Sequence, residues 1–158
     1  MLTFLQDLFS RATEKQLVFF WLIFCFAALT YKLGGVPPYH SDENFYVESS
    51  RNMVQSGDYL TPIYHDKKRF AKPILYYWLV SASYKVFGVN LVSARLTSAF
   101  FGSLTIALLY LVSSRLFEGR IALYSILILP ATFLHFQISR WATTDIVMSF
   151  FILLALYF

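Results

Sequence analysis

Charge and cysteine are both scarce in this sequence. Only 14 % of its 158 residues are charged, whereas about a quarter are charged in an average soluble domain. Cys25 is the single cysteine, which excludes a disulfide scaffold within the chain. No small-residue cleavage site follows the first apolar run, where Tyr31, Lys32 and Leu33 are bulky, so we expect an uncleaved anchor rather than a signal peptide.

The net charge of +4 raises the question of a nucleic-acid partner. The basic residues lie between apolar segments and beside carboxylates, and the sequence contains no recognisable nucleic-acid-reading module. Nucleic acid is therefore not an expected partner. Lipid phosphate is the anion that we expect beside these cations.

Apolar and aromatic residues are abundant instead. Hydrophobic residues make up 58 % of the chain and aromatic residues 20 %. Tyr and Trp favour the headgroup zone of a membrane, where the ring is buried and the polar end stays wet. This composition predicts an all-α integral membrane protein with membrane lipids around it.

About four apolar segments predict membrane helices, which we place at residues 17–33, 91–114, 121–138 and 145–158. A short amphipathic segment, 1–16, precedes the first, and Pro130 is expected to bend the third. Residues 146–158 cover only about 20 Å of a hydrocarbon core of about 30 Å. We therefore expect the last helix to be truncated and the chain to be a fragment.

Residues 34–90 form a long polar connection between the first two spans. Gly34 to Pro38 break the first helix. Ser41 is a candidate cap for a helix from Asp42 to about Gln55, and a second helix is expected over Ile74–Phe87, ending at Gly88. Both helices are too short to span easily, so we expect them to lie in the membrane interface.

The second span also has a packing signal. Ala94, Ser98 and Gly102 recur every four residues, as do Ala99, Ser103 and Ala107. Small residues at this spacing let two helices approach closely in lipid.

The predicted crossings gather most charges on one side of the membrane. That side holds nine of the thirteen basic residues and six of the nine acidic residues. The basic set is Lys32, Arg51, Lys67, Lys68, Arg69, Lys72, Lys85, Arg95 and Arg140, and the acidic set is Asp42, Glu43, Glu48, Asp58, Asp66 and Asp145. A plain count of Lys and Arg puts this side in the cytoplasm, but the rule weakens for long loops, so the residues alone leave orientation open.

Three short stretches on this side contain candidate functional residues: 40–43, 67–73 and 140–145. A carboxylate at the membrane surface can act as a general base, while Lys and Arg can bind a phosphate and stabilise its leaving charge. Asp145 opens an apolar helix, where an idle charge is costly. Alternatively, Asp42 and Glu43 are ordinary helix-start residues, and Lys67–Arg69 contacts lipid headgroups.

Metal ligation has little support in the sequence. His65 with Asp66, or His40 with Asp42, could supply ligands, but these pairs lack a recognisable spacing. Solvated loop residues are the simpler interpretation, and we assign no cofactor.

Several strings resemble the polyprenyl-phosphate-dependent membrane glycosyltransferases of the GT-C class, which include the bacterial aminoarabinose transferases and protein O-mannosyltransferase relatives. The strings are Ser41-Asp42-Glu43, Arg51 to Tyr59, Phe70 to Trp78, Phe87-Gly88, Ser93 to Leu96, Arg115 to Phe117 and Arg140 to Asp145. They keep the family's order over nearly all of residues 17–158. The ordered set is specific, although each piece alone is weak.

The resemblance implies a GT-C helix bundle whose first loop, with two interfacial helices, is extracytoplasmic. It also implies location in the bacterial cytoplasmic membrane and inverting transfer of a sugar from a polyprenyl-phosphate donor to a lipid, protein or glycan acceptor. Asp42, Glu43 and Asp145 would be catalytic, and Lys72 would bind the donor phosphate with Arg69 and Arg140. Ala71 replaces a glutamate of many relatives, so a divalent metal is not assigned.

Two other classes stay open on the residues. A lipid transporter or flippase fragment also suits basic residues beside a membrane, although no internal repeat is apparent. A small non-enzymatic membrane protein that associates through the Ala94–Ser98–Gly102 face is the second alternative.

Overall fold

The structure is a computed structural model that describes residues 2–38, 41–117 and 119–158, with side chains from residue 14 onward except at 41. Its elements are α1 (Leu2–Thr30), α2 (Ser41–Ser56), β1 (Ile63–Tyr64), β2 (Lys67–Lys68), α3 (Leu75–Phe87), α4 (Leu91–Leu116), α5 (Gly119–Ala131), α6 (Phe133–Ile138) and α7 (Asp145–Tyr157). The described chain is therefore almost entirely helical, as expected.

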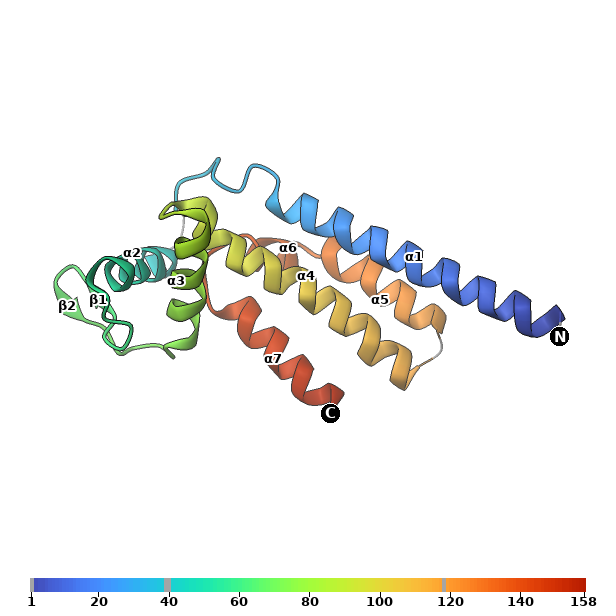
Figure 1. The fold of residues 1–158 in the computed structure, drawn as a ribbon. Helices are drawn as coiled ribbons and strands as arrows, with labels where there is room; N and C mark the ends of the chain where they lie inside the picture. Colours follow the sequence, from blue (N-terminus) through green and yellow to red (C-terminus); the bar gives the residue numbers. More distant parts are fainter. Residues whose placement is uncertain (1, 39–40, 118) are drawn as a thin grey trace.

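The helices form two groups (Figure 1). Helices α1, α4, α5 and α7 lie alongside one another, and α4 packs against the other three. Helices α2 and α3 gather with the β1–β2 hairpin at one end of this bundle, far from the N-terminus of α1. The charged residues of the 34–90 segment are thereby collected at one end.

Helix α4 is the central element. Within the described residues, it is the one helix whose length and apolar composition suffice to cross a membrane, while α5 and α7 are apolar but shorter. The face predicted from small residues is buried at Ala94, Ser98 and Gly102. A Cβ at Gly102 would overlap the side chain of Ser139, so glycine is required where α4 meets the segment after α6.

Two helix boundaries differ from the sequence-based expectation. Residues 2–30 form one continuous helix, α1, because no residue that breaks helices separates the two predicted segments, and this helix ends at Thr30 rather than at Leu33. The predicted bent helix over 121–138 is two helices, α5 and α6. Pro130 lacks an N–H for the helical ladder, and Thr132 is extended, with φ −73° and ψ 135°.

The hairpin was not predicted. Ile63 pairs with Lys68 and Tyr64 with Lys67 in an antiparallel register. His65 and Asp66 form the turn with φ values of 46° and 60°, the left-handed geometry that suits a two-residue hairpin. Both strands have only two residues, too few for an alternating pattern to be visible.

The core beneath the polar end is built from tyrosines. Tyr46 of α2 packs edge-on against Tyr76 of α3, with ring centroids 4.9 Å apart. The Tyr76 and Ser98 hydroxyls are 2.7 Å apart and hydrogen-bonded, and the Tyr84 hydroxyl donates to the Val47 carbonyl at 3.2 Å. Buried phenols need such partners, so these bonds fix α2, α3 and α4 relative to one another.

Candidate functional site

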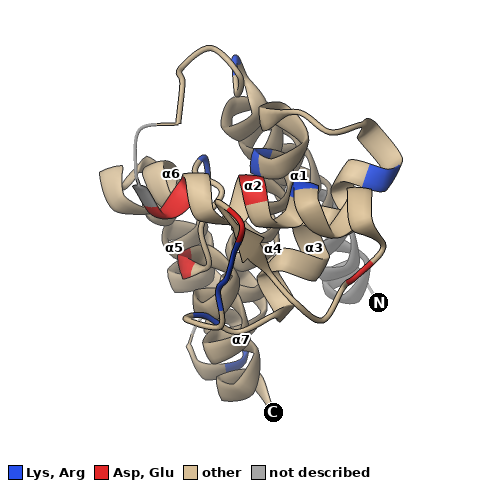
Figure 2. Ribbon diagram, turned by 90° about the vertical axis from the view of Figure 1, so that its left-hand side faces the viewer, with Lys and Arg blue, Asp and Glu red and all other residues tan. Residues whose placement is uncertain are grey.

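Charged residues of both signs gather at the end formed by α2, the hairpin and α3, which faces the viewer in Figure 2. This end contains three cavities of interest: a groove between α3 and α7, a polar cleft along α2, and a small pocket beside the end of α1. Of the predicted site residues, Lys72 and Asp145 line the groove and Arg140 lines the small pocket, whereas Asp42, Glu43 and Arg69 line none of the three.

The groove brings Lys72 and Asp145 together from positions 73 residues apart in the sequence. Its volume is about 650 Å³, and both residues line it with Tyr76 and Thr144. Below them the walls are apolar, and they include Val147, Met148, Phe151 and Ile152 of α7. A cation and a carboxylate above an apolar channel can accommodate an amphiphile with an anionic head.

Lys72 and Asp145 differ in their partners. Within the described residues, no carboxylate forms an ion pair with Lys72. The Asp145 carboxylate accepts a hydrogen bond from the Thr143 hydroxyl at 2.9 Å. Both side chains are exposed to the groove side of the molecule, so Lys72 can receive an anion without first breaking an internal pair.

Asp42 approaches the same region through Tyr46. Asp42 is half-buried in the first turn of α2, and the Tyr46 hydroxyl one turn later donates to Thr144 Oγ1 at 3.4 Å. Burial raises the pKa of Tyr46, and the charges of Asp42 and Asp145 raise it further. Both aspartates therefore act on one phenol beside the groove.

Glu43 has different surroundings from Asp42. It is fully buried, and Arg95 of α4 is only 3 % exposed. Arg95 donates from Nε to Oε1 at 2.6 Å and from Nη2 to Oε2 at 2.9 Å. Oε1 also accepts from the Ala142 backbone N–H at 3.0 Å. With both oxygens engaged, Glu43 orients its neighbours instead of facing the groove.

Arg95 also secures the segment after α1. Its guanidinium donates to the carbonyls of Leu33, Val36 and Pro37 at 2.7, 2.8 and 3.4 Å. Arg95 was predicted on the charged side, but this role was not predicted. The available signal was a cation four residues into a helix of mostly small and apolar residues.

Arg69 and Arg140 do not line the groove with Lys72. The Arg69 guanidinium lies over the Phe45 ring at 3.5 Å and beside Tyr77, whose pKa is raised by burial while Arg69 opposes the rise. Arg140 donates to the carbonyls of Ala28, Leu29 and Tyr31 at 3.2, 2.8 and 2.8 Å. The structure therefore does not bring Arg69 and Arg140 together with Lys72 in one cavity.

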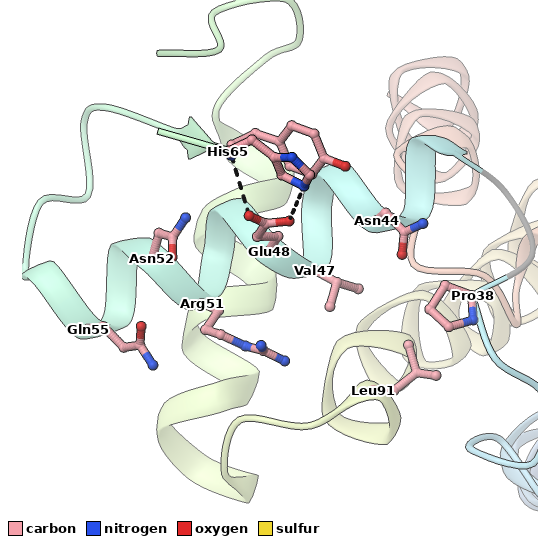
Figure 3. Close-up of a pocket in the computed structure, with 10 residues that line it drawn as sticks. Pro38, Asn44, Val47, Glu48, Arg51, Asn52, Gln55, His65 and Leu91 are labelled. Atoms are coloured by element: carbon pink, nitrogen blue, oxygen red, sulfur yellow. Dashed lines mark hydrogen bonds and ion pairs between the residues drawn. The ribbon is translucent and has the colours of Figure 1, made fainter. Parts of the chain in front are cut away.

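The polar cleft runs along the opposite side of α2 (Figure 3). It has a volume of about 710 Å³ and includes Asn44, Glu48, Arg51 and Asn52 in its walls. Glu48 pairs with His65 of the hairpin at 3.3 Å. None of its lining residues lines the Lys72–Asp145 groove, so the two cavities are separate.

The candidate metal ligands are not clustered. Throughout residues 14–38, 42–117 and 119–158, no group of three His, Cys, Asp or Glu side chains could hold a metal ion. His65 pairs with Glu48 rather than with Asp66, and His40 lies outside the described residues. Ala71 contributes no ligand atom next to Lys72.

Residues 71–158, more than half of the chain, match the family described as dolichyl-phosphate-mannose-protein mannosyltransferase. The chain belongs to this family. As a member, it is related to the GT-C membrane glycosyltransferases, as the ordered strings indicated.

Individual relatives agree with the family assignment. An uncharacterised protein of Aquifex aeolicus is 40 % identical over 128 residues, which are 80 % of this chain and 26 % of the relative. The undecaprenyl phosphate-alpha-4-amino-4-deoxy-L-arabinose arabinosyl transferase of Photorhabdus laumondii is 32 % identical over 139 residues, covering 86 % of this chain and 25 % of that enzyme.

A solved structure shares the fold of this chain. The crystal structure of ArnT from Cupriavidus metallidurans bound to undecaprenyl phosphate superposes with a TM-score of 0.77 at 30 % identity, covering 85 % of this chain and 26 % of ArnT. This chain thus spans about a quarter of the length of the curated relatives that it matches.

Proposed function

We propose that this chain forms the N-terminal part of a membrane glycosyltransferase that transfers a sugar from a polyprenyl-phosphate donor to a lipid, protein or glycan acceptor. The observation that supports this proposal is the Lys72–Asp145 groove: a lysine ammonium, without an ion-pair partner among the described residues, and a carboxylate above an apolar channel of about 650 Å³. The ArnT relative was crystallised with undecaprenyl phosphate, an amphiphile of the kind that such a groove can accept.

In the proposed membrane arrangement, α1, α4, α5 with α6, and α7 cross or enter the bilayer. Segment 34–90 is extracytoplasmic, with α2 and α3 in the interface, and the protein lies in the cytoplasmic membrane. Lys72 and Asp145 then face the outer leaflet, where a polyprenyl phosphate presents its head. The absence of a nucleotide-sugar cradle in the sequence agrees with a lipid-borne donor.

In the proposed reaction, the acceptor hydroxyl or amine attacks the anomeric carbon of the donor sugar and inverts it. A new bond forms at that carbon while its bond to the phosphate oxygen breaks. The oxygen keeps the electron pair, and Lys72 stabilises the resulting phosphate charge. Asp42 accepts the proton of the acceptor, and Asp145 helps to orient the reacting groups beside it.

The remaining predicted residues receive supporting roles. Glu43 holds the start of α2, and with it Asp42, through its pair with Arg95 and its bond to Ala142. Arg69 lies over the Phe45 ring, and its Nε is buried without a hydrogen-bond partner among the described residues. It could contact a phosphate only if its guanidinium left Phe45. Arg140 is assigned no donor contact.

The test uses the complete gene product in membranes with a polyprenyl-phosphate sugar donor. Lys72→Ala and Asp42→Asn should each lower transfer at least about 100-fold, because each removes a group that acts in the transition state. Lys85→Ala is the matched control. Lys85 is an exposed lysine that lies over Tyr59, 4.4 Å from the ring centroid, away from the groove.

Turnover should be measured at saturating donor, together with the amount of folded protein in the membrane. Wild-type turnover in Lys72→Ala would remove the proposed phosphate contact, and wild-type turnover in Asp42→Asn would remove the proposed base. If no sugar transfer occurs with any polyprenyl-phosphate donor but the protein moves a lipid between leaflets, the transporter alternative takes its place.

A further inference from the structure

Beside the end of α1 lies a small pocket with a cationic lining. Its volume is about 280 Å³, and Lys32, Arg95 and Arg140 line it together with Gln137 and Trp141. Arg95 forms an ion pair with Glu43. Within the described residues, no carboxylate forms an ion pair with Lys32 or Arg140, so the pocket has an excess of positive charge.

The cationic side chains of this pocket lie close together. Burial lowers the pKa of Arg140, and the charge of Arg95 lowers it further, as expected for like charges held close together. Arg140 donates hydrogen bonds to the carbonyls of Ala28 and Leu29 near the end of α1 and of Tyr31 just after it, and these bonds fix the guanidinium in place. A bound anion would relieve the repulsion between these cations.

An apolar groove lies about one helical turn before the cationic pocket along α1. This groove, of about 230 Å³, lies between α1 and the α5–α6 pair, and its walls include Trp21, Cys25, Ala28 and Phe136. Helix α1 lies alongside α5 and α6 in Figure 1. The positions 21, 24, 25 and 28 form one helical face, which extends about 10 Å along the axis at 1.5 Å per residue.

Arg140 joins the two cavities. It donates to the carbonyls of Ala28 and Leu29, which line the apolar groove, and its guanidinium lies over the ring of Phe136, 5.2 Å from the centroid. A headgroup on Lys32 and Arg140 would therefore direct its hydrocarbon chain into the groove. Trp141 lines the cationic pocket, at the level where indoles favour the interface, and Trp21 lines the apolar groove, where its Nε1 donates to the Ile126 carbonyl at 2.9 Å.

We propose that these two cavities form a binding site for an anionic phospholipid, separate from the donor groove. The phosphate and anionic headgroup contact Lys32 and Arg140, and one acyl chain lies between α1 and the α5–α6 pair. None of the residues that line these cavities lines the Lys72–Asp145 groove. The lipid would brace the end of α1 against the segment before α7.

The experiment uses the complete gene product in phosphatidylcholine nanodiscs with a small fraction of phosphatidylglycerol that has a photoreactive group in one acyl chain. We expect crosslinks within residues 21–28 and 127–136. Lys32→Gln should weaken the lipid affinity about fivefold, the effect of one lysine near an anionic headgroup, and so lower the yield about threefold at lipid that half-saturates the wild type. Lys85→Gln, an exposed lysine elsewhere on the polar end, should leave the yield unchanged.

The apolar half has its own pair of variants. Ala131→Trp places an indole in the groove wall and should abolish labelling of residues 21–28, whereas Ile128→Trp should not, because Ile128 is 63 % exposed on the same helix and does not line the groove. Thermal unfolding of each variant checks that it folds. If Ala131→Trp does not fold, the Lys32→Gln result decides.

Other occupants predict different results. Equal labelling by photoreactive phosphatidylcholine, or an unchanged yield in Lys32→Gln, would overturn the anionic preference. Displacement by millimolar inorganic phosphate would indicate a simple anion site, and displacement by polyprenyl phosphate a second donor site. Lipid labelling is measured without sugar transfer, so its failure is distinguishable from failure of the proposed transferase activity.

Discussion

At the scale of single residues, two adjacent acids have opposite environments. Asp42 is half-buried near the groove, whereas Glu43 is fully buried against Arg95. Helical periodicity explains the difference, since Glu43, Tyr46, Ser50 and Met53 form the buried face of α2. Residue type alone gave both acids the same candidate role, and the spacing of apolar residues was the signal that separates them.

The Glu43–Arg95 pair gives a stability prediction. Glu43→Gln leaves the Arg95 guanidinium buried without its counter-charge, which costs about 3–5 kcal/mol. Glu48→Gln is the matched control, because Glu48 pairs with the exposed His65 and such surface pairs contribute at most about 1 kcal/mol. Thermal or denaturant unfolding of the complete gene product in detergent measures both changes.

The same comparison tests the positioning role of Glu43. We expect Glu43→Gln to unfold far more easily than Glu48→Gln, with a loss of transfer that follows the loss of folded protein. Equal stability of the two variants would mean that the buried pair contributes little. A large loss of turnover at full stability would instead make Glu43 a participant in the reaction.

At the scale of elements, sequence patterns located helices better than turns. The bounds of α2, α3, α4 and α7 lie within two residues of the predicted ones, because a cap, a glycine or a proline marks most of these ends. Gly88 ends α3 with φ 82°, a conformation that favours glycine. The two-residue strands have no periodicity to detect.

The end of the bundle at which the candidate residues gather could be predicted from the topology. An even number of crossings predicted that the stretches around Asp42, Lys72 and Asp145 share one end of the bundle. The groove brings Lys72 and Asp145 together, and Tyr46 links Asp42 to them. Side-chain direction was not predictable, so Arg140, five residues before Asp145, was expected in the same place but bonds to the end of α1.

Helix packing gives a second prediction, at Gly102. Gly102→Ala adds a Cβ that overlaps the Ser139 side chain, and the shift needed to relieve it costs about 1–3 kcal/mol. Gly119→Ala is the control, because open space surrounds a Cβ at that position. Unfolding of the two variants in detergent should show a lower free energy of unfolding for Gly102→Ala alone.

A neutral result at Gly102 would have a definite meaning. It would show that α4 and the segment around Ser139 separate easily, and that the small-residue face of α4 is not a tight contact. The connection between α6 and α7, which positions Asp145, would then depend on Arg140, on the Glu43–Ala142 bond and on the Tyr46–Thr144 bond.

At the scale of the whole molecule, the surface itself indicates a membrane environment. Large apolar side chains are exposed along α1, α5 and α7, among them Phe20, Phe24, Ile128, Met148 and Leu156. A soluble monomer rarely exposes so much contiguous apolar surface. Such faces are compatible with lipid or with further helices, and the chain spans about a quarter of its relatives' length.

The charge count and the proposed function favour opposite orientations of the molecule in the membrane. Counting Lys and Arg in short loops favours a cytoplasmic polar end, whereas the proposed function requires an extracytoplasmic one. Charge counts direct insertion mainly through short loops, and segment 34–90 is long. We therefore expect α2, the hairpin and α3 to face outward, with their cations retained for phosphate binding.

Single cysteines in a cysteine-free complete gene product test this orientation. Gln55→Cys is exposed at the polar end, and Gln16→Cys and Arg120→Cys are exposed at the other. A membrane-impermeant maleimide should label Gln55→Cys in intact cells and the other two only after permeabilisation. The reverse pattern would put Lys72 on the cytoplasmic leaflet, where a lipid-borne donor at the outer face could not reach it.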